Sequence, residues 1–141
     1  NYYKQKEVAK SIRLQKTDSL VFKFDLTLAE RTEKWQFYKK VTLENTQKLA
    51  WNDASFLKDI GQTYLKHIID TESLKKSIFW VKHSLEINDS YDGNLLIARL
   101  YNKIKDKKMA LQYAKDAKVI CTEMTWNPKE VDTLLAELNT K

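Results

Sequence analysis

The sequence is poor in the residues that interrupt regular structure. Among 141 residues there are only two glycines and one proline, and no stretch is rich in Gly, Ser or Pro. Flexible linkers between separate domains are therefore not expected, and neither is a glycine-rich loop that could cradle a phosphate group. Lys, Leu, Ala, Glu and Gln are abundant instead, and these residues favour helix over strand or disorder.

Cysteine is nearly absent, and long apolar runs are lacking. The single Cys121 excludes an internal disulfide framework and a C-x-x-C redox motif. Because it lies beside Val119 and Ile120, we expect a small buried hydrophobic residue rather than a nucleophile. No apolar stretch approaches the length of about 18 residues that a membrane-spanning helix needs, so membrane insertion is not expected.

Clustered charge and paired metal ligands are lacking too. The formal net charge is +6, and residues 1–50 hold eleven basic against six acidic residues, but no run of five basic residues occurs. The basic excess is interpreted as the solvated surface of a Lys-rich helical protein, so no nucleic-acid partner is expected. His67 and His83 form no H-E-x-x-H motif and no metal spacing with Cys121. We therefore expect no active site, no metal and no cofactor.

The chain does contain a template of small and aromatic residues that occurs twice. Ser77 and Ala110 are 33 residues apart, and so are Ser84 and Ala117. A fixed period of this kind is typical of stacked helix pairs, in which small residues let neighbouring helices approach closely. The sequence predicts an all-α fold of stacked antiparallel helix pairs, with about seven helices. The alternative is an ordinary helical bundle with coincidental alanine spacing.

This template resembles the tetratricopeptide repeat. The second copy has small, apolar and aromatic residues at the family's positions without a gap: Ile97, Ala98, Tyr101, Ala110 and Ala117. It departs at Asn94, where a large apolar residue is usual, at Ala114, where an aromatic residue is usual, and in lacking the closing proline. In the first copy Gly61 and Ser77 are sixteen residues apart where the family has twelve, and we expect residues 67–73 to absorb the difference.

Residues from about Trp35 to Glu137 also look like the C-terminal helical tail of certain bacterial envelope proteins that carry a thioredoxin-fold domain. The segments with this similarity are residues 56–64, 77–88 and 106–114. The resemblance implies an export signal and a redox-type domain upstream of Asn1, and a location in the bacterial periplasm or cell envelope. It gives a second hypothesis for function, in which the chain is the accessory helical domain of a thiol–disulfide enzyme.

Three segments of one continuous domain are expected. Residues 1–50 hold N-terminal helices with a degenerate pair, residues 51–123 the two repeats, and residues 124–141 a capping helix.

A first helix is predicted over 2–16, with Thr17-Asp18-Ser19 as the N-cap of the next one. Residues 20–28 alternate as a strand would but also carry an i, i+4 apolar stripe, and we favour helix. Later helices are predicted to be capped by Asn52 or Asp53, to start at Thr71 or Ser73, and to be capped within residues 88–90. Asn127 is predicted to cap the last helix, with Pro128 at its first position.

In the tetratricopeptide family the first helix of each pair lines the ligand-binding face. The residues that match those positions predict a basic, amide-bearing strip made of Lys58, Gln62, Lys66, Arg99, Asn102 and Lys103. Such a strip could hold an acidic segment or the carboxylate of a peptide, or a domain of the same polypeptide. The first hypothesis is therefore a non-enzymatic scaffold for protein–protein or interdomain contact. The alternative for these residues is a solvated helix face.

Overall fold

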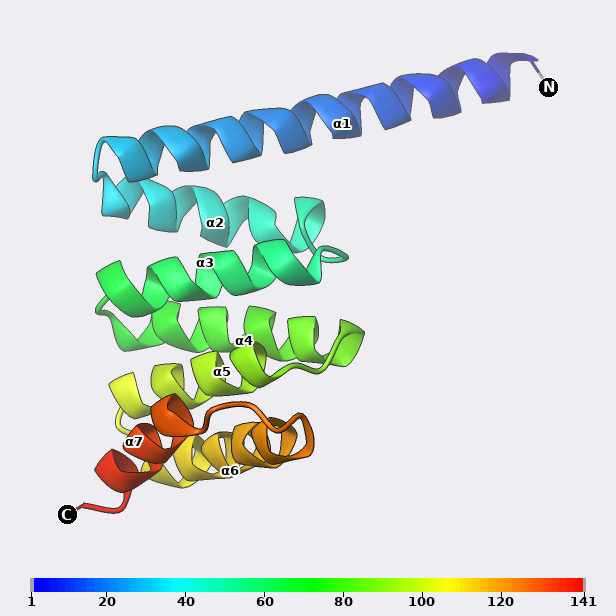
Figure 1. Cartoon of the computed structure of the whole chain (residues 1–141). Coiled ribbons are helices and arrows are strands. Elements are labelled where there is room, and N and C mark those ends of the chain that lie inside the picture. The colour runs from blue at the N-terminus through cyan, green and yellow to red at the C-terminus, as the bar shows by residue number, and fades with distance from the viewer. Residues whose placement is uncertain (1, 141) are drawn as a thin grey trace. The chain divides into compact units, whose positions relative to one another are not determined.

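The computed structural model describes residues 2–140, and within them it contains seven α-helices and no strand. The predicted all-α fold with about seven helices is confirmed. The helices, shown in Figure 1, are α1 (Tyr2–Arg31), α2 (Trp35–Leu49), α3 (Ala54–His67), α4 (Thr71–Ile87), α5 (Tyr91–Lys103), α6 (Lys107–Glu123) and α7 (Lys129–Leu138). They form two compact units, Asn1–Trp51 and Asn52–Lys141.

The first unit consists of one long helix and one short helix. α1 has 30 residues and α2 has 15, so α1 is about 45 Å long and α2 about half of that. α2 packs along the C-terminal half of α1, where Phe22, Leu26 and Ala29 are buried. In the N-terminal half, every described side chain from Tyr3 to Asp18 is exposed, because α1 extends past the end of α2 (Figure 1).

The predicted helix break at residues 17–19 is wrong, because α1 continues through it. The hydroxyl of Thr17 donates a hydrogen bond to the carbonyl oxygen of Arg13 at 3.0 Å, so it is satisfied inside the helix and caps nothing. Residues 20–28 are helical, as favoured from the sequence. Their strand-like alternation has a simple cause: Phe22 and Leu26 are buried, whereas Leu20 and Phe24 are exposed on the other side of the helix.

In the second unit, helices α3 to α6 each begin at a side-chain cap. The side chains of Asp53, Asp70, Ser90 and Asp106 accept a hydrogen bond from the backbone N–H three residues later. The caps predicted at Asp53 and in the segment 88–90 are therefore found, while α4 begins at Thr71 with Asp70 as its cap. Because each cap satisfies one N–H that the helix leaves without a partner, it defines where the helix starts.

Small residues form the contact between these helices. Ser77, Ser84, Ala110 and Ala117 are all fully buried. Gly61 lies so close to its neighbours that an added Cβ would be 2.5 Å from Cγ2 of Val81 and 3.0 Å from Cδ2 of Leu96. These contacts come from α4 and α5, so α3 can pack tightly against both helices only because residue 61 has no side chain.

The two helix pairs differ by one turn in register. α3 and α5 begin 37 residues apart (54 and 91), and α4 and α6 begin 36 apart (71 and 107), although the small residues recur every 33. Ser77 is the seventh residue of α4, whereas Ala110 is the fourth residue of α6. The extra residues expected within 67–73 therefore lengthen the start of α4, while both linkers, 68–70 and 104–106, keep three residues.

Within residues 2–140, three helices are followed, two residues after their last residue, by a residue with positive φ that is not glycine. These residues are Glu33 (φ 54°), Lys105 (φ 66°) and Thr125 (φ 55°). The following N–H donates each time to a carbonyl five residues back, as in the 2.9 Å bond from Asp106 to Tyr101. A left-handed C-terminal residue thus closes α1, α5 and α6 without glycine, at a conformational cost that glycine would avoid.

The last helix covers part of α6. α7 packs against α6 and buries Val131, Leu134 and Leu138. The side chain of Asn127 accepts a hydrogen bond from the N–H of Lys129 at 3.0 Å, so it satisfies the start of the helix as predicted. Pro128, however, occupies the cap position rather than the first helical position. The boundary differs from the prediction by one residue.

Candidate binding grooves

The predicted ligand-binding positions of α3 and α5 meet in one groove, here called the α3–α5 groove. Its volume is about 400 Å³. The third wall comes from α7, which contributes one carboxylate. The lining residues are Ser55, Lys58, Asp59, Gln62, Asp92, Leu95, Leu96, Arg99 and Glu130. The groove therefore joins matching positions of the two helix pairs.

The α3–α5 groove brings three of the six predicted strip residues together. Lys58 and Gln62 from α3 and Arg99 from α5 all line it. Three carboxylates line it as well, at Asp59, Asp92 and Glu130, so two cations stand against three anions. The groove has mixed charge, whereas the sequence predicted a basic strip. A ligand that fits it presents an anionic group to Lys58 and Arg99 and hydrogen-bond donors to the carboxylates.

The other three strip residues lie outside this groove. Lys66 is exposed and Asn102 is half-buried, and neither lines it. The ammonium group of Lys103 donates a hydrogen bond to the backbone carbonyl oxygen of Leu65 at 2.5 Å. Partial burial lowers the pKa of Lys103, because the charged form loses contact with water. Lys103 thus connects α5 to the C-terminal end of α3.

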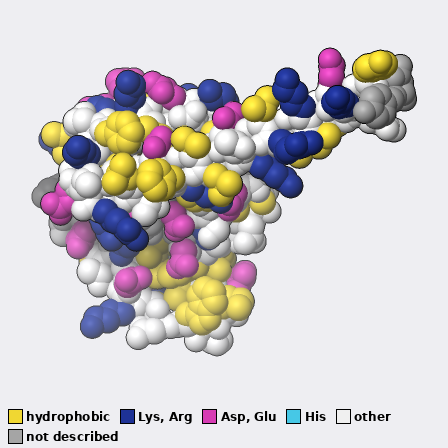
Figure 2. Space-filling model, turned by 90° about the horizontal axis from the view of Figure 1, so that it is seen from above, with side chains coloured by type: hydrophobic (Ala, Val, Ile, Leu, Met, Phe, Trp, Pro, Cys, Tyr) yellow, Lys and Arg dark blue, Asp and Glu magenta, His cyan; other side chains and the backbone are white. Residues whose placement is uncertain are grey.

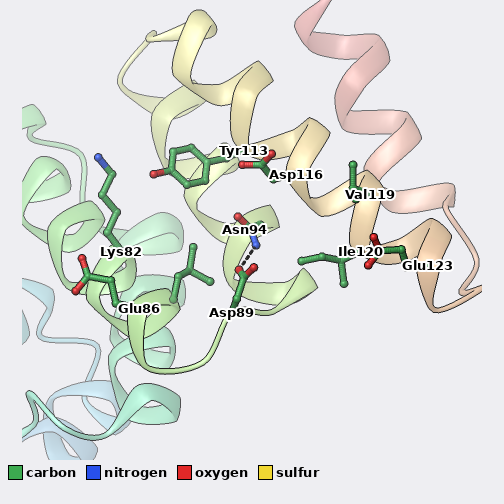
Figure 3. A pocket seen from close by; sticks show the side chains of 10 residues that line it. Lys82, Glu86, Asp89, Asn94, Tyr113, Asp116, Val119, Ile120 and Glu123 are labelled. Atoms are coloured by element: carbon green, nitrogen blue, oxygen red, sulfur yellow. Dashed lines mark hydrogen bonds between the residues drawn. The ribbon is translucent and has the colours of Figure 1, made fainter.

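A second groove, here called the α4–α6 groove, lies between the second helices of the two pairs. Its volume is about 580 Å³. Figure 3 shows side chains of α4 on one side and of α6 on the other, with Asp89 and Asn94 between them. The lining residues are Lys82, Leu85, Glu86, Asp89, Asn94, Tyr113, Asp116, Val119, Ile120 and Glu123. One cation and four carboxylates make this groove acidic.

Lys82 lies at the aromatic end of the α4–α6 groove. Its ammonium group is 5.3 Å from the ring centre of Tyr101 and 5.9 Å from that of Tyr113, and the two rings stack with their centres 5.7 Å apart. Hydrogen bonding to Tyr101 raises the pKa of Lys82, against the opposing effect of partial burial. Burial raises the pKa of Tyr113, because the charged form of its hydroxyl loses contact with water.

The opposite end of the α4–α6 groove is fixed by a buried amide. The side-chain nitrogen of Asn94 donates to Oδ1 of Asp89 and to the carbonyl oxygen of Ser90, both at 2.8 Å. Asn94 is only 3% exposed. This network explains why a polar residue occupies a position where the tetratricopeptide pattern has a large apolar one: both hydrogens of the amide are satisfied locally.

The α4–α6 groove is not predicted from the sequence. Its carboxylates come from α4, from the linker that holds Asp89 and from α6, and two of them, Glu86 and Asp116, belong to helices distant in the sequence. One local signal was available: Tyr113, Asp116 and Ile120 follow one another at intervals of three and four residues, so they share one face of α6. The pairing with α4 depends on the register of the stacked pairs.

The cysteine and the two histidines lie in different parts of the second unit. Cys121 is fully buried, and its Sγ lies 3.5 Å from the carbonyl oxygen of Trp126. Nδ1 of His83 is 3.2 Å from Oε2 of Glu86, and His67 is the last residue of α3.

Among residues 2–140, no three His, Cys, Asp or Glu side chains are grouped so that they could hold a metal ion. In the same range, no helix is long and apolar enough to cross a membrane.

Comparison of the chain with known protein families, with curated proteins and with solved structures finds no match. The resemblance to the tetratricopeptide repeat therefore depends on the residues named above and on nothing further. The same holds for the resemblance to the helical tail of thioredoxin-fold envelope proteins.

Proposed function

We propose that the chain is a non-enzymatic helical-repeat scaffold that binds a protein segment in the α3–α5 groove. The observation that carries the proposal is the convergence of Lys58, Gln62 and Arg99, from two consecutive pairs, in one groove of about 400 Å³. Helix residues one turn apart present such side chains on one face, so stacked pairs produce a continuous ligand surface. The groove would supply geometry and charge, without bond-making chemistry.

The mixed charge of the groove limits the kinds of ligand that it can bind. Lys58 and Arg99 can each donate charge-assisted hydrogen bonds to a carboxylate, and Arg99 can do so with two parallel bonds. Gln62 can both donate to and accept from a peptide backbone. Asp59, Asp92 and Glu130 favour N–H donors or a cation beside the anionic group. The fitting partner is an extended segment that carries both a carboxylate and a basic or amide side chain.

The test is a peptide selection followed by a comparison of variants. Peptides are selected from a random library on the intact chain, and their affinity is measured by fluorescence anisotropy. The double variant Lys58→Ala, Arg99→Ala should bind at least about tenfold more weakly, because each lost charge-assisted bond is worth about 1.5–3 kcal/mol. Both side chains lie at a groove surface, so the thermal midpoint should stay within a few degrees of the unchanged chain.

The matched control changes charges in the other groove. Glu86→Gln and Asp116→Asn remove two carboxylates of the α4–α6 groove and leave the α3–α5 groove intact. These variants should keep full affinity for the selected peptides. If the control loses affinity and the Lys58, Arg99 variant keeps it, the groove is wrongly chosen although the chain still binds peptides. If no library yields a saturable ligand, the scaffold proposal itself is contradicted.

A further inference from the structure

α1 has two apolar faces, and only one of them is covered. Phe22, Leu26 and Ala29 are buried on the side of α2. On the opposite side of the helix, five large apolar side chains are 47–70% exposed: Leu14, Leu20, Val21, Phe24 and Leu28. This second set, here called the outer face of α1, contains no charged residue between Leu14 and Leu28, since Thr17 is the remaining member.

The outer face is long enough to form a specific contact. From Leu14 to Leu28 it covers about 21 Å of helix. Figure 2 looks down on α1 and shows hydrophobic side chains along it, with Lys and Arg side chains gathered on its projecting half. If each of the five side chains has about 100 Å² to bury, two such faces together bury about 1,000 Å². That value is at the lower limit for a specific protein–protein interface.

The face also has a natural centre of symmetry. Leu14, Val21 and Leu28 recur every seven residues, so Leu14 and Leu28 are equally far from Val21. Two copies of α1 that cross in opposite directions at Val21 therefore place Leu14 of each copy against Leu28 of the other. Beside Leu28 lies a groove of about 310 Å³ that is lined by Ala29, Thr32, Lys34 and Phe37. This groove can receive the leucine of the second copy.

The charges of α1 select the antiparallel direction. Residues 2–16 contain five basic residues and one acidic residue, a net charge of +4, while residues 17–31 contain two basic and three acidic residues, a net charge of −1. A parallel pair would place the two +4 halves side by side. An antiparallel pair centred on Val21 aligns residues 11–31 of the two copies, which contain four basic and three acidic residues, and leaves residues 2–10 of each copy beyond the end of the other copy's α1. The two +4 halves are therefore kept apart, which lowers the repulsion between the copies.

From this arrangement we infer that the outer face of α1 is a homodimer interface, in which two copies of the chain associate through antiparallel α1 helices around Val21. The occupant of the face is a second copy, because antiparallel copies place Leu14 against Leu28, bury enough area for a specific interface and keep their basic halves apart. The contact is apolar, and each N-terminal unit carries a net positive charge. The dimer should therefore hold or strengthen as salt screens the repulsion.

The first experiment measures the mass of the whole chain by light scattering during size-exclusion chromatography. At about 100 µM the chain should be a dimer with a dissociation constant in the micromolar range, and 0.5 M NaCl should not weaken it. Phe24→Asp should raise the dissociation constant at least about 100-fold, because it places a charge in the interface twice. The matched control is Phe79→Asp, the same change at a phenylalanine that is exposed on α4.

The second experiment tests the direction of pairing and does not depend on the folding of the Phe24 variant. A mixture of Leu14→Cys and Leu28→Cys chains should form a disulfide between positions 14 and 28 under mild oxidation, while the buried Cys121 stays unreactive. Bonds between two copies of position 14 would overturn the antiparallel arrangement. A chain that is monomeric at 100 µM, or a dimer that survives Phe24→Asp as it survives the control, would overturn the proposal.

Discussion

The two units of the chain bury their apolar side chains in different ways. In the unit Asn52–Lys141, each of the helices α3 to α6 packs against more than one other helix, and small residues such as Gly61 and Ala117 bring the helices close. In the unit Asn1–Trp51, α1 packs against α2 along one half of one face. The difference shows that helix content alone does not define a core: a helix also needs neighbours that cover its apolar side chains.

The largest expected effect compares a buried leucine with an exposed one. Leu57 is fully buried in α3, whereas Leu20 in α1 is 70% exposed. Leu57→Ala should lower the free energy of unfolding by about 3 kcal/mol, since it leaves a cavity. Leu20→Ala should change it by less than about 0.5 kcal/mol at concentrations where the chain is monomeric. Urea titration followed by circular dichroism measures both. Equal losses would show that α1 has a core of its own.

The next effect tests the close approach at Gly61. In an exposed helix, Gly→Ala stabilises by about 1 kcal/mol because alanine restricts the unfolded chain. Gly61→Ala should have the opposite sign and cost about 1–3 kcal/mol, because its Cβ would lie 2.5 Å from Cγ2 of Val81, a stiff β-branched side chain. The double variant with Val81→Ala should recover part of the loss. A stabilised single variant would mean that α3 and α4 have room to move apart.

The contacts at Gly61 also explain why the second unit was largely predictable from sequence. The small residues Ser77, Ser84, Ala110 and Ala117 predicted the helix contacts, and the polar residues at positions 53 and 90 marked helix starts. The one-turn shift of α4 was not predictable in detail. Periodicity gives the face of a helix but not where along the face the helix begins.

In the first unit, the helix break predicted at residues 17–19 is wrong for a physical reason. Thr17-Asp18-Ser19 contains three good capping residues, but a cap also needs the chain to leave the helix before it. No glycine or proline stands there, and the hydroxyl of Thr17 bonds back to Arg13 inside α1.

In the second unit, three of the six predicted strip residues line the α3–α5 groove, while Lys103 instead donates a hydrogen bond to Leu65. Such competition between partners is a property of packed side chains.

A smaller effect concerns the caps of the second unit. The carboxylate of Asp106 accepts from the N–H of Met109 at 3.2 Å and starts α6. Asp106→Ala should cost about 1 kcal/mol, and Asp106→Asn should cost clearly less, because the amide oxygen can still accept that bond. Asp18→Ala in α1 is the matched control, since Asp18 lies inside a helix and should cost nothing measurable. Thermal unfolding distinguishes these outcomes. A loss at Asp18 equal to that at Asp106 would restore the predicted helix break.

The smallest expected effect is an increase in the stability of the folded chain. Lys105 has φ of 66°, which is unfavourable for a residue with a Cβ, and it closes α5. Lys105→Gly should stabilise the chain by about 0.5–1 kcal/mol, because glycine adopts this conformation freely, while Lys108→Gly, in the first turns of α6, should destabilise it by about 1 kcal/mol. Calorimetry of the two variants, which remove the same charge, compares them directly. A destabilised Lys105 variant would indicate that the lysine side chain itself contributes to the turn.

Each of the helices α3 to α6 is packed against at least two others, whereas every described side chain from Tyr3 to Asp18 of α1 is exposed in the single chain. Hydrogen exchange followed by mass spectrometry, at about 0.1 µM where the chain is monomeric, tests this contrast most directly. Amides of α4 and α5 should stay protected for hours, while those of residues 3–16 should exchange within seconds, because an unsupported helix opens readily. Equal protection in both regions at this concentration would show that the N-terminal half of α1 is as well supported as α4 and α5.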